Sequence, residues 1–292
     1  MKNEQADKSE QRPNSVAIIG CGWLGSALVK SLVANQYHVI ATTQQVAKLT
    51  HIQALGAEAE ILSLPFNEAG LDKNSVFDCQ TIVICITPGI RQGKKDYADK
   101  VVQLVQQAEK GQVNKIILIS STAVYDGNVG DVTEMTTIQS DIEKVAIISG
   151  AEQAVLSFKQ QSIVVRAAGL VGKDRHPGKF FQQQRKLKNP NAYVNLIHQT
   201  DLVAQLQLLI QSVDLTGVFN AVSETQLTKK QYYSTAAQVL NLPAPVFDDG
   251  IDENVERARG KNIIGSKLSS SIAYQFKYGD MLHWLKADDN DQ

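Results

Sequence analysis

Three glycines near the start of the chain have a spacing that could bind a dinucleotide. Residues 16–25 read VAIIGCGWLG, so Gly20, Gly22 and Gly25 form the pattern G-x-G-x-x-G after a short apolar run. Gly20 permits a tight turn out of a strand, Gly22 lets the backbone approach two linked phosphates, and Gly25 lets the following helix pack closely. The N-terminus of that helix supplies N–H donors and about half a positive charge. The pattern predicts a dinucleotide site; the alternative is a turn that is tight only for packing.

Alternating strands and helices through the first 170 residues must position this turn. Apolar runs of strand length are separated by helical patterns of about 10–15 residues, which is typical of right-handed βαβ units in a parallel sheet. We expect strands at Val16–Gly20, His38–Thr43, Glu58–Leu62, Thr81–Thr87, Lys115–Ser120 and Ser162–Ala167. We expect helices at Trp23–Asn35, Val46–Leu55 and Tyr97–Glu109, and one that begins at the capping box Ser140-x-x-Glu143.

Beyond residue 171 the alternation changes. A helix is expected at Phe180–Leu187, a strand at Tyr193–Ile197, and a helix at Leu202–Val213 that begins at Thr200 or Asp201. A second capping box, Thr228-x-x-Gln231, begins another helix. Because this part cannot extend the sheet by simple alternation, we expect it to form a smaller lobe at the carboxyl edge of the sheet.

The predicted fold class is therefore α/β, a Rossmann-type doubly wound parallel sheet with a smaller C-terminal α/β substrate lobe. The predicted organisation is a flexible N-terminal lead (1–14), an NAD(P)-binding domain (15–170), a substrate lobe (171–286) and an acidic tail (287–292).

The composition argues against several classes of function. Of 292 residues, 43% are hydrophobic and 20% charged, and the formal net charge of −1 favours neither nucleic acid nor an anionic membrane as a partner. No apolar run approaches the length of a spanning helix, and the polar first 14 residues do not resemble a signal peptide. Three cysteines and five histidines lack metal-ligand spacing, and the odd cysteine count suits a reducing, cytoplasmic compartment. We expect a small-molecule substrate and no metal; the oligomeric state stays open.

Four further segments carry a resemblance to a known family. They are ISSTAVYDG (119–127), VVRAAGLVGKDRHPG (164–178), NLIHQTDLV (195–203) and GVFNAVSETQLTKKQYY (217–233). In order and spacing they are similar to the S-S-x-x-V-Y-G, R-x-x-G-I-Y-G-P-G-R, N-x-I-H-x-x-D-L and G-x-Y-N-V elements of extended short-chain dehydrogenases/reductases. Within this superfamily the chain most resembles the atypical NAD(P)-binding, sugar-nucleotide epimerase-like proteins, which open with G-C-G-x-L-G.

The resemblance implies NAD or NADP as the cofactor and indicates which residues contact it. It assigns the diphosphate to Gly20, Gly22, Trp23, Leu24 and Gly25, the adenosine ribose to Thr43 and Gln44, and other contacts to Thr87, Pro88, Ser120, Ala168 and Leu170. After the second strand an acidic residue would bind the ribose hydroxyls of NAD, whereas an arginine would favour the phosphate of NADP. The sequence here is ATTQQ, with neither. Lys48, one turn on, is either a phosphate partner or a solvated lysine.

The catalytic pattern of the superfamily is incomplete. In Y-x-x-x-K, the lysine lowers the pKa of a tyrosine that exchanges the hydroxyl proton, because a free phenol titrates at about 10. Counting back from Glu152, the two positions fall on Lys144 and Ile148, and no tyrosine lies in that helix to restore the pair. Ser121 takes the position of the serine that orients substrate. Tyr125 and Lys144 are the candidate replacements for the acid–base group.

The resemblance implies an NAD(P)-dependent oxidoreductase or epimerase-like enzyme acting on a small hydroxyl, carbonyl or sugar-nucleotide-like substrate. We expect that substrate between the sheet and the lobe, against residues 121–135 and 174–198. Either a substitute acid–base group acts, or the substrate needs little proton assistance. The alternative is a catalytically weak or inactive NAD(P)-binding sensor or scaffold. A polar cleft faced by Ser121 and Tyr125 favours catalysis, whereas a collapsed or apolar cleft favours the binding protein.

Overall fold

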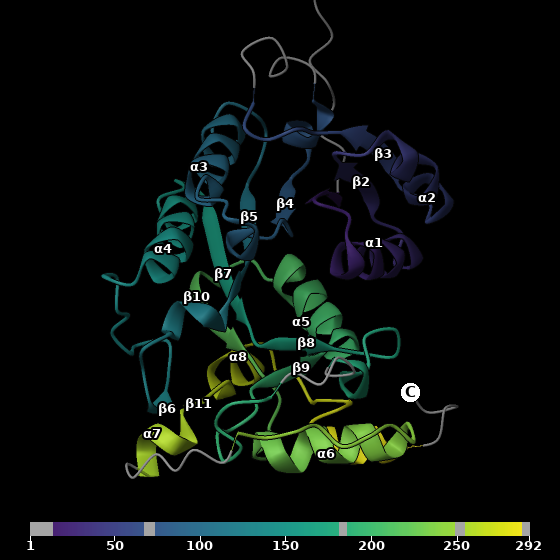
Figure 1. Ribbon diagram of the computed structural model, residues 1–292. Helices are drawn as coiled ribbons and strands as arrows, with labels where there is room; N and C mark the ends of the chain where they lie inside the picture. The colour runs from purple at the N-terminus through teal and green to yellow at the C-terminus, as the bar shows by residue number, and fades with distance from the viewer. Residues whose placement is uncertain (1–13, 67–73, 181–185, 249–254, 288–292) are drawn as a thin grey trace, which may run out of the picture.

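A seven-stranded parallel sheet forms the centre of the molecule (Figure 1). The computed structural model describes residues 14–66, 74–180, 186–248 and 255–287. The strand order is β10-β7-β5-β4-β1-β2-β3, and all neighbouring strands are parallel. These strands are β1 (Ser15–Ile19), β2 (His38–Thr43), β3 (Glu58–Ile61), β4 (Thr81–Ile84), β5 (Lys115–Ser121), β7 (Gln161–Ala167) and β10 (Gly217–Ala221). The order runs outward from β1 in both directions, so the expected doubly wound sheet is confirmed.

Helices cover both faces of this sheet. They are α1 (Trp23–Ala34), α2 (Leu49–Ala54), α3 (Tyr97–Ala108), α4 (Glu143–Leu156) and α5 (Gln199–Gln211). Along β1 the side chains alternate between two hydrophobic clusters: Val16 and Ile18 pack with the leucines of α1 and α5, while Ala17 and Ile19 pack with α3 and part of α4. The sheet is therefore buried on both faces, which explains why its strands read as continuous apolar runs.

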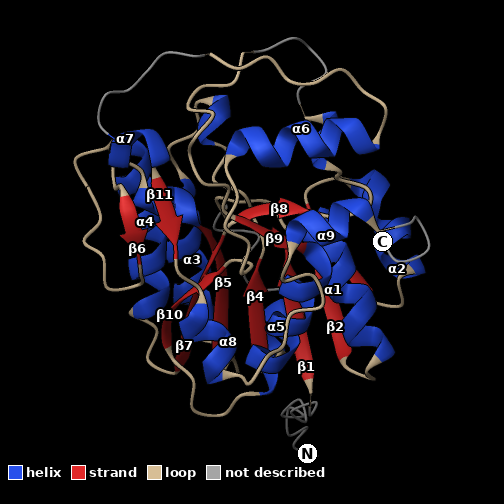
Figure 2. Cartoon of the chain, turned by 90° about the horizontal axis from the view of Figure 1, so that it is seen from below, coloured by secondary structure: helices blue, strands red, loops and turns tan. Residues whose placement is uncertain are grey.

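Most of the remaining elements lie beyond the carboxyl ends of the strands (Figure 2), whereas the helix Ser266–Ser271 lies against β10. The remaining elements are β6 (Gly130–Val132), β8 (Gly169–Val171), β9 (Leu196–His198), β11 (Lys261–Ile263), α6 (Lys229–Val239), α7 (Val255–Arg259), α8 (Ser266–Ser271) and α9 (Met281–Lys286). Two parallel pairs, β8–β9 and β6–β11, lie outside the central sheet. A third hydrophobic cluster gathers around Trp284 and Tyr232. Within the described ranges, no helix has both the length and the apolar character needed to cross a bilayer.

The expectation that residues after 171 do not extend the sheet is wrong. β10 pairs with β7 from Gly217 to Ala221, and α5 packs against α1. The chain returns to the sheet only after a long excursion through β8 and β9, which simple alternation does not reveal. The bounds of the two domains remain a prediction. Residues 181–185 of the expected helix 180–187, and most of both expected tails, lie outside the described residues.

Three helix starts test the capping signals in the sequence. The capping box of α6 is present, with Thr228 and Gln231 bonded to each other's backbone N–H groups, as expected. The box expected at Ser140 is not formed, because α4 begins two residues later with Ile142 as its N-cap. α5 begins after His198, whose Nδ1 atom accepts from the Thr200 N–H at 3.2 Å, not at Thr200 or Asp201.

Asp201 is fully buried and holds the C-terminal segment. Its carboxylate accepts from the Tyr274 hydroxyl at 2.7 Å and from the backbone N–H groups of Lys277 and Tyr278 at 2.7 and 3.1 Å. The same segment brings Tyr278 against the His198 ring, with ring centroids 4.1 Å apart. The start of α5 is thus a junction between the sheet and the C-terminal part of the chain.

Acid should weaken this junction through His198. Burial, with a contribution from the charge of Lys277, lowers the pKa of His198 to about 4. The unfolded chain, where histidine titrates at about 6.5, therefore binds the proton first as the pH falls. The stability that His198 contributes is present above about pH 6.5 and is lost progressively towards pH 4.

The variant His198→Asn keeps an N-cap acceptor but removes the titrating ring. When the pH falls from about 7 to 4.5, its free energy of unfolding should decrease by about 1–3 kcal/mol less than that of the native chain. Urea denaturation at a series of pH values measures this difference. Identical pH dependence in the two proteins would contradict the assignment.

Candidate cofactor-binding site

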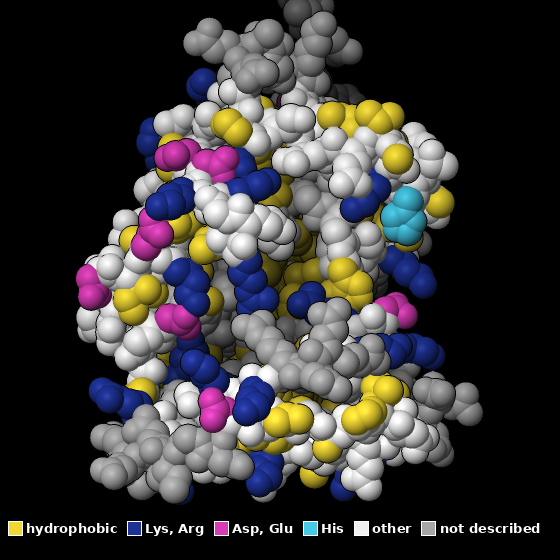
Figure 3. All heavy atoms as spheres, in the orientation of Figure 1, with side chains coloured by type: hydrophobic (Ala, Val, Ile, Leu, Met, Phe, Trp, Pro, Cys, Tyr) yellow, Lys and Arg dark blue, Asp and Glu magenta, His cyan; other side chains and the backbone are white. Residues whose placement is uncertain are grey.

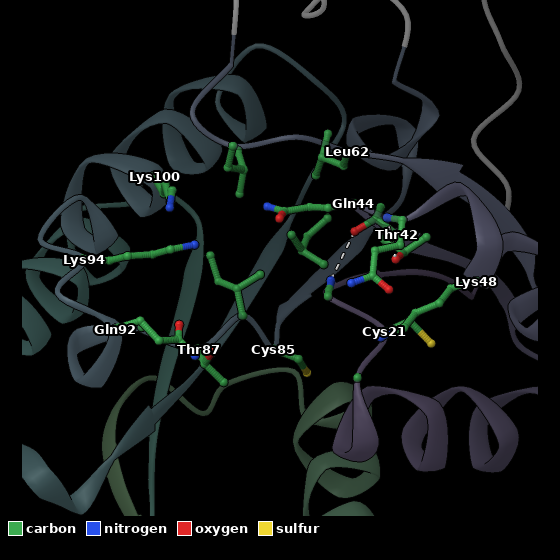
Figure 4. Close-up of a pocket in the computed structure, with 18 residues that line it drawn as sticks. Cys21, Thr42, Gln44, Lys48, Leu62, Cys85, Thr87, Gln92, Lys94 and Lys100 are labelled. Atoms are coloured by element: carbon green, nitrogen blue, oxygen red, sulfur yellow. Dashed lines mark hydrogen bonds between the residues drawn. The ribbon is translucent and has the colours of Figure 1, made fainter.

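A pocket of about 300 Å³ opens at the carboxyl ends of β1, β2 and β4 (Figure 4). In the sheet, β1 lies between β2 and β4, and the strand order runs in opposite directions on its two sides. Doubly wound sheets bind ligands at this point, where the strand order reverses. The pocket is lined by Ile19, Gly20, Cys21, Gly22, Thr42, Thr43, Gln44, Gln45, Lys48, Leu62, Leu64, Cys85, Ile86, Thr87, Gly89, Gln92, Lys94 and Lys100.

The glycine turn forms one wall, and each glycine has its own reason to be there. Gly20 has φ +98°, which side chains other than glycine rarely adopt. A Cβ atom at Gly25 would lie 2.5 Å from the Gly20 carbonyl oxygen, so only glycine allows α1 to pack here. A Cβ atom at Gly22 would meet nothing within 4 Å. Gly22 therefore borders open space where a ligand can approach the backbone.

The turn is also fixed in a geometry that suits an anion. Gly20 N–H donates to Thr42 Oγ1 at 3.1 Å and Cys21 N–H donates to the Thr42 carbonyl at 2.8 Å, which ties the turn to β2. Gly22 is the N-cap of α1 and has no side chain to cap it. The first N–H groups of α1 therefore remain available to a diphosphate. The residues present fit a dinucleotide.

The predicted cofactor contacts divide into two groups. Gly20, Gly22, Thr43, Gln44 and Thr87 line the pocket. The other predicted contacts are not among its lining residues: Trp23, Leu24, Gly25, Pro88, Ser120, Ala168 and Leu170. Their roles as contacts stay predictions, and several have structural partners described below.

Sequence reasoning missed the wall opposite β2. Gly89, Gln92 and Lys94 come from the loop that follows β4, and Lys100 comes from α3. Gly89 and Gly93 both have positive φ and turn this loop back, so that Gln92 and Lys94 border the pocket. The sequence does contain a signal for this wall: Gly89 and Gly93, followed by the basic pair Lys94 and Lys95, come directly after a buried strand.

Tyr125, a candidate acid–base group, is fully buried. Its hydroxyl donates to Asn220 Oδ1 at 2.8 Å and accepts from Arg166 Nη1 at 2.8 Å. Burial raises the pKa of Tyr125, although Arg166 and Asn220 oppose that rise. A base that acts near neutral pH needs a lowered pKa and access to substrate, so this environment suits a structural role.

Arg166 and Glu152 form the buried ion pair behind Tyr125. Arg166 Nη2 lies 2.7 Å from Glu152 Oε2, and Nε contacts both carboxylate oxygens. Ser120 Oγ donates to Glu152 Oε1 at 2.5 Å. These hydrogen bonds satisfy charges that would be costly to bury alone. They join β5, α4 and β7, and they engage the Ser120 hydroxyl that was predicted to face the cofactor.

Lys144, the other candidate, lies in a partly exposed polar cluster. Its ammonium forms an ion pair with Asp126, whose second oxygen lies 2.8 Å from Lys261 Nζ. Burial alone would raise the pKa of Asp126, but hydrogen bonds from Lys144 and Lys261 outweigh it and lower that pKa. Lys261 also donates to the Thr122 carbonyl at 3.0 Å, directly after β5.

Ser121 and Ile148 complete the catalytic region. Ser121 Oγ accepts from the Ala123 N–H at 3.1 Å, which leaves its own O–H able to donate. Ile148 is 2% exposed and packs in the hydrophobic core, so the lysine position of the usual pair is closed to a cofactor. Metal ligation finds no support either, since no group of three or more His, Cys, Asp or Glu residues in the described ranges could hold an ion.

The glycine-turn pocket agrees with what is known of similar chains. Residues 20–194 match the family described as NAD(P)H-binding. The chain belongs to this NAD(P)H-binding family. Its cofactor class, NAD or NADP, is therefore established, as the resemblance implied.

One relative and two solved structures extend the comparison. Protein YeeZ of Escherichia coli K12 is 30% identical over 277 residues, 91% of this chain and 97% of that protein. A conserved protein of unknown function from Silicibacter pomeroyi has TM-score 0.75 and 21% identity over 95% of this chain and 99% of that one. UDP-glucuronic acid 4-epimerase from Bacillus cereus, solved with UDP-glucuronic acid and NAD, has TM-score 0.76 and 17% identity over 95% and 98% of the chains. These structures share the fold.

Two glycine variants should separate binding from folding. Gly22→Leu places a side chain in open space and should abolish NAD(P) binding, while its loss of stability stays near the cost of a poorer N-cap, about 1 kcal/mol. Gly25→Ala forces a methyl group against a carbonyl oxygen and should destabilise the fold itself. Calorimetric titration and thermal unfolding measure both effects. Unchanged cofactor affinity in folded Gly22→Leu would contradict the site.

Proposed function

We propose that this chain is an NAD(P)-dependent oxidoreductase or epimerase-like enzyme acting on a small hydroxyl, carbonyl or sugar-nucleotide-like substrate. Two observations carry the proposal together: a dinucleotide pocket at the carboxyl end of β4, and a half-exposed amine–carboxylate cluster that follows the neighbouring strand β5. An epimerase of the same fold was solved with UDP-glucuronic acid and NAD, which supports the substrate class. The substrate would lie against residues 121–135 and 174–198.

The proton step in this proposal belongs to Lys144. When bound, the cofactor supplies or accepts the hydride. Lys144 Nζ, held as an ammonium by Asp126, donates a proton to the substrate oxygen in reduction. The Lys144 and Asp126 side chains are 39% and 35% exposed, so both can be reached from solvent. The Ser121 hydroxyl, with its proton free, orients the same oxygen.

Tyr125 has a structural role in this scheme. Its hydroxyl holds Arg166 and Asn220 together and has no exposed surface. Removing that hydroxyl by Tyr125→Phe would leave a buried guanidinium and a buried amide each short of one partner. The effect should appear as a loss of stability of about 1–3 kcal/mol and not as a change in the pH profile of turnover.

A second function, cofactor binding without turnover, has its own support. Ile148 closes the lysine position and the only tyrosine in the matching V-Y-G segment is buried, so the usual chemistry has no counterpart in these residues.

We also propose a cytoplasmic location, because Cys21, Cys79 and Cys85 are all free thiols.

The test combines binding with turnover. Calorimetric titration of the full chain with NAD⁺ and NADP⁺ comes first, followed by a screen of UDP-sugars monitored by reduced-nicotinamide absorbance and by product analysis. Lys144→Met should lower kcat at least tenfold, since general acid–base groups contribute about 10²–10⁴, and should leave the cofactor Kd unchanged. Lys95→Met is the matched control, because Lys95 is exposed on a neighbouring loop and pairs with Glu143.

Each result has one interpretation. Native turnover in Lys144→Met would remove Lys144 from the mechanism. Cofactor binding without turnover of any sugar nucleotide would favour the second function. Absence of binding to either dinucleotide would reject the enzyme and the binding protein together.

A further inference from the structure

The pocket wall at the end of β2 carries positive charge and no carboxylate. Among the described residues that line the pocket, none is Asp or Glu, whereas Lys48, Lys94 and Lys100 all line it. NAD and NADP differ in this region by a phosphate on the 2′ position of the adenosine ribose. A carboxylate here binds the two ribose hydroxyls of NAD and repels that phosphate, whereas a cation attracts it.

Lys48 is the cation nearest in the chain to the ribose position. It ends the 3₁₀ turn Val46–Lys48 directly after β2, its side chain is exposed, and its N–H donates to the Gln45 carbonyl at 2.9 Å. Lys48 and Cys21 line the same pocket, and Figure 4 shows the Lys48 side chain next to Cys21 of the glycine turn. In the described part of the chain, Lys48 has no ion-pair partner.

The neighbouring residues offer neutral hydrogen-bond donors. Thr43 Oγ1 accepts from the Gln45 N–H at 3.1 Å, which leaves the Thr43 hydroxyl proton free to donate. Gln44 is exposed and lines the pocket with its amide. Together with Lys48 these groups match a phosphate, which is an acceptor on every oxygen, better than a pair of hydroxyls.

Lys94 and Lys100 belong to the opposite wall (Figure 4). Lys100 pairs with Asp96 at 2.8 Å, so its charge is balanced. Lys94 comes from the loop after β4 and its side chain reaches towards the pocket. The space-filling view of the face seen in Figure 1 shows Lys and Arg side chains gathered around a central hollow (Figure 3). The surroundings therefore favour the more anionic dinucleotide.

We infer that this pocket selects NADP(H) over NAD(H), with Lys48 as the partner of the 2′-phosphate. The inference rests on the cofactor site of the proposed function and specifies which dinucleotide it takes. It differs from the NAD found in the Bacillus cereus epimerase structure. Lys94, on the far wall, contributes general attraction and does not distinguish the two cofactors.

Calorimetric titrations of the full chain test this. The native protein should bind NADP⁺ about tenfold or more tightly than NAD⁺, as expected for a charged hydrogen bond. Lys48→Gln should weaken NADP⁺ binding by about that factor and change the Kd for NAD⁺ less than about twofold. The fragments adenosine 2′,5′-bisphosphate and 5′-AMP should show the same contrast, because they differ by the 2′-phosphate alone. Lys94→Gln is the matched control and should affect both cofactors alike.

The possible results separate the inference from the function beneath it. Equal affinity of the native protein for both dinucleotides, or an equal loss for both in Lys48→Gln, would overturn the inference and leave the cofactor site intact. If Lys94→Gln weakened NADP⁺ binding but not NAD⁺ binding, the 2′-phosphate would lie at the wall opposite β2, and the inference would be overturned. Binding of neither dinucleotide would reject the proposed function itself.

Discussion

The contact between Gly25 and the Gly20 carbonyl is the constraint on which the rest of the molecule depends. Because Gly25 has no side chain, the start of α1 can pack closely against the end of β1. A Cβ atom at Gly25 would lie 2.5 Å from the Gly20 carbonyl oxygen. This approach places the uncapped start of α1 next to Gly22, which lines the pocket. It also fixes where Trp23 lies, because Trp23 is the first residue of α1.

Trp23 in turn joins the cofactor turn to the C-terminal part of the chain. Its carbonyl accepts from the Gln199 side chain at 3.0 Å, at the start of α5, and a Cβ atom at Gly172 would lie 3.1 Å from its ring. The Arg175 guanidinium carbon lies 5.6 Å from the ring centroid. Trp23, which was predicted to contact the diphosphate, thus anchors the loop after β8 and connects the glycine turn to the segment proposed to contact substrate.

The sequence predicted what depends on local pattern. The glycine turn, the alternating strands and the capping box at Thr228 follow from neighbours in the chain, and the structure confirms them. The surroundings of Tyr125 could not be predicted in this way, because its partner Asn220 is 95 residues away on β10. The alternation of strands and helices did not indicate that β10 pairs with β7. The same limit applies to Lys94, whose approach to the pocket depends on how the loop after β4 turns back.

The stretch of α4 that resembles the Tyr–Lys region contributes to two separate groups of polar contacts, one buried and one exposed. Where α4 would carry the pair, Ile148 packs in the core and Glu152 pairs with Arg166, so this stretch of helix works as structure. The partly exposed group is centred on Asp126, whose carboxylate forms ion pairs with Lys144 from α4 and Lys261 from β11. Asn195 accepts from Ile263 N–H and donates to the Lys261 carbonyl, which holds β11 in place. Any chemistry at Lys144 therefore depends on the C-terminal part of the chain being docked, since Lys261 shares the same carboxylate.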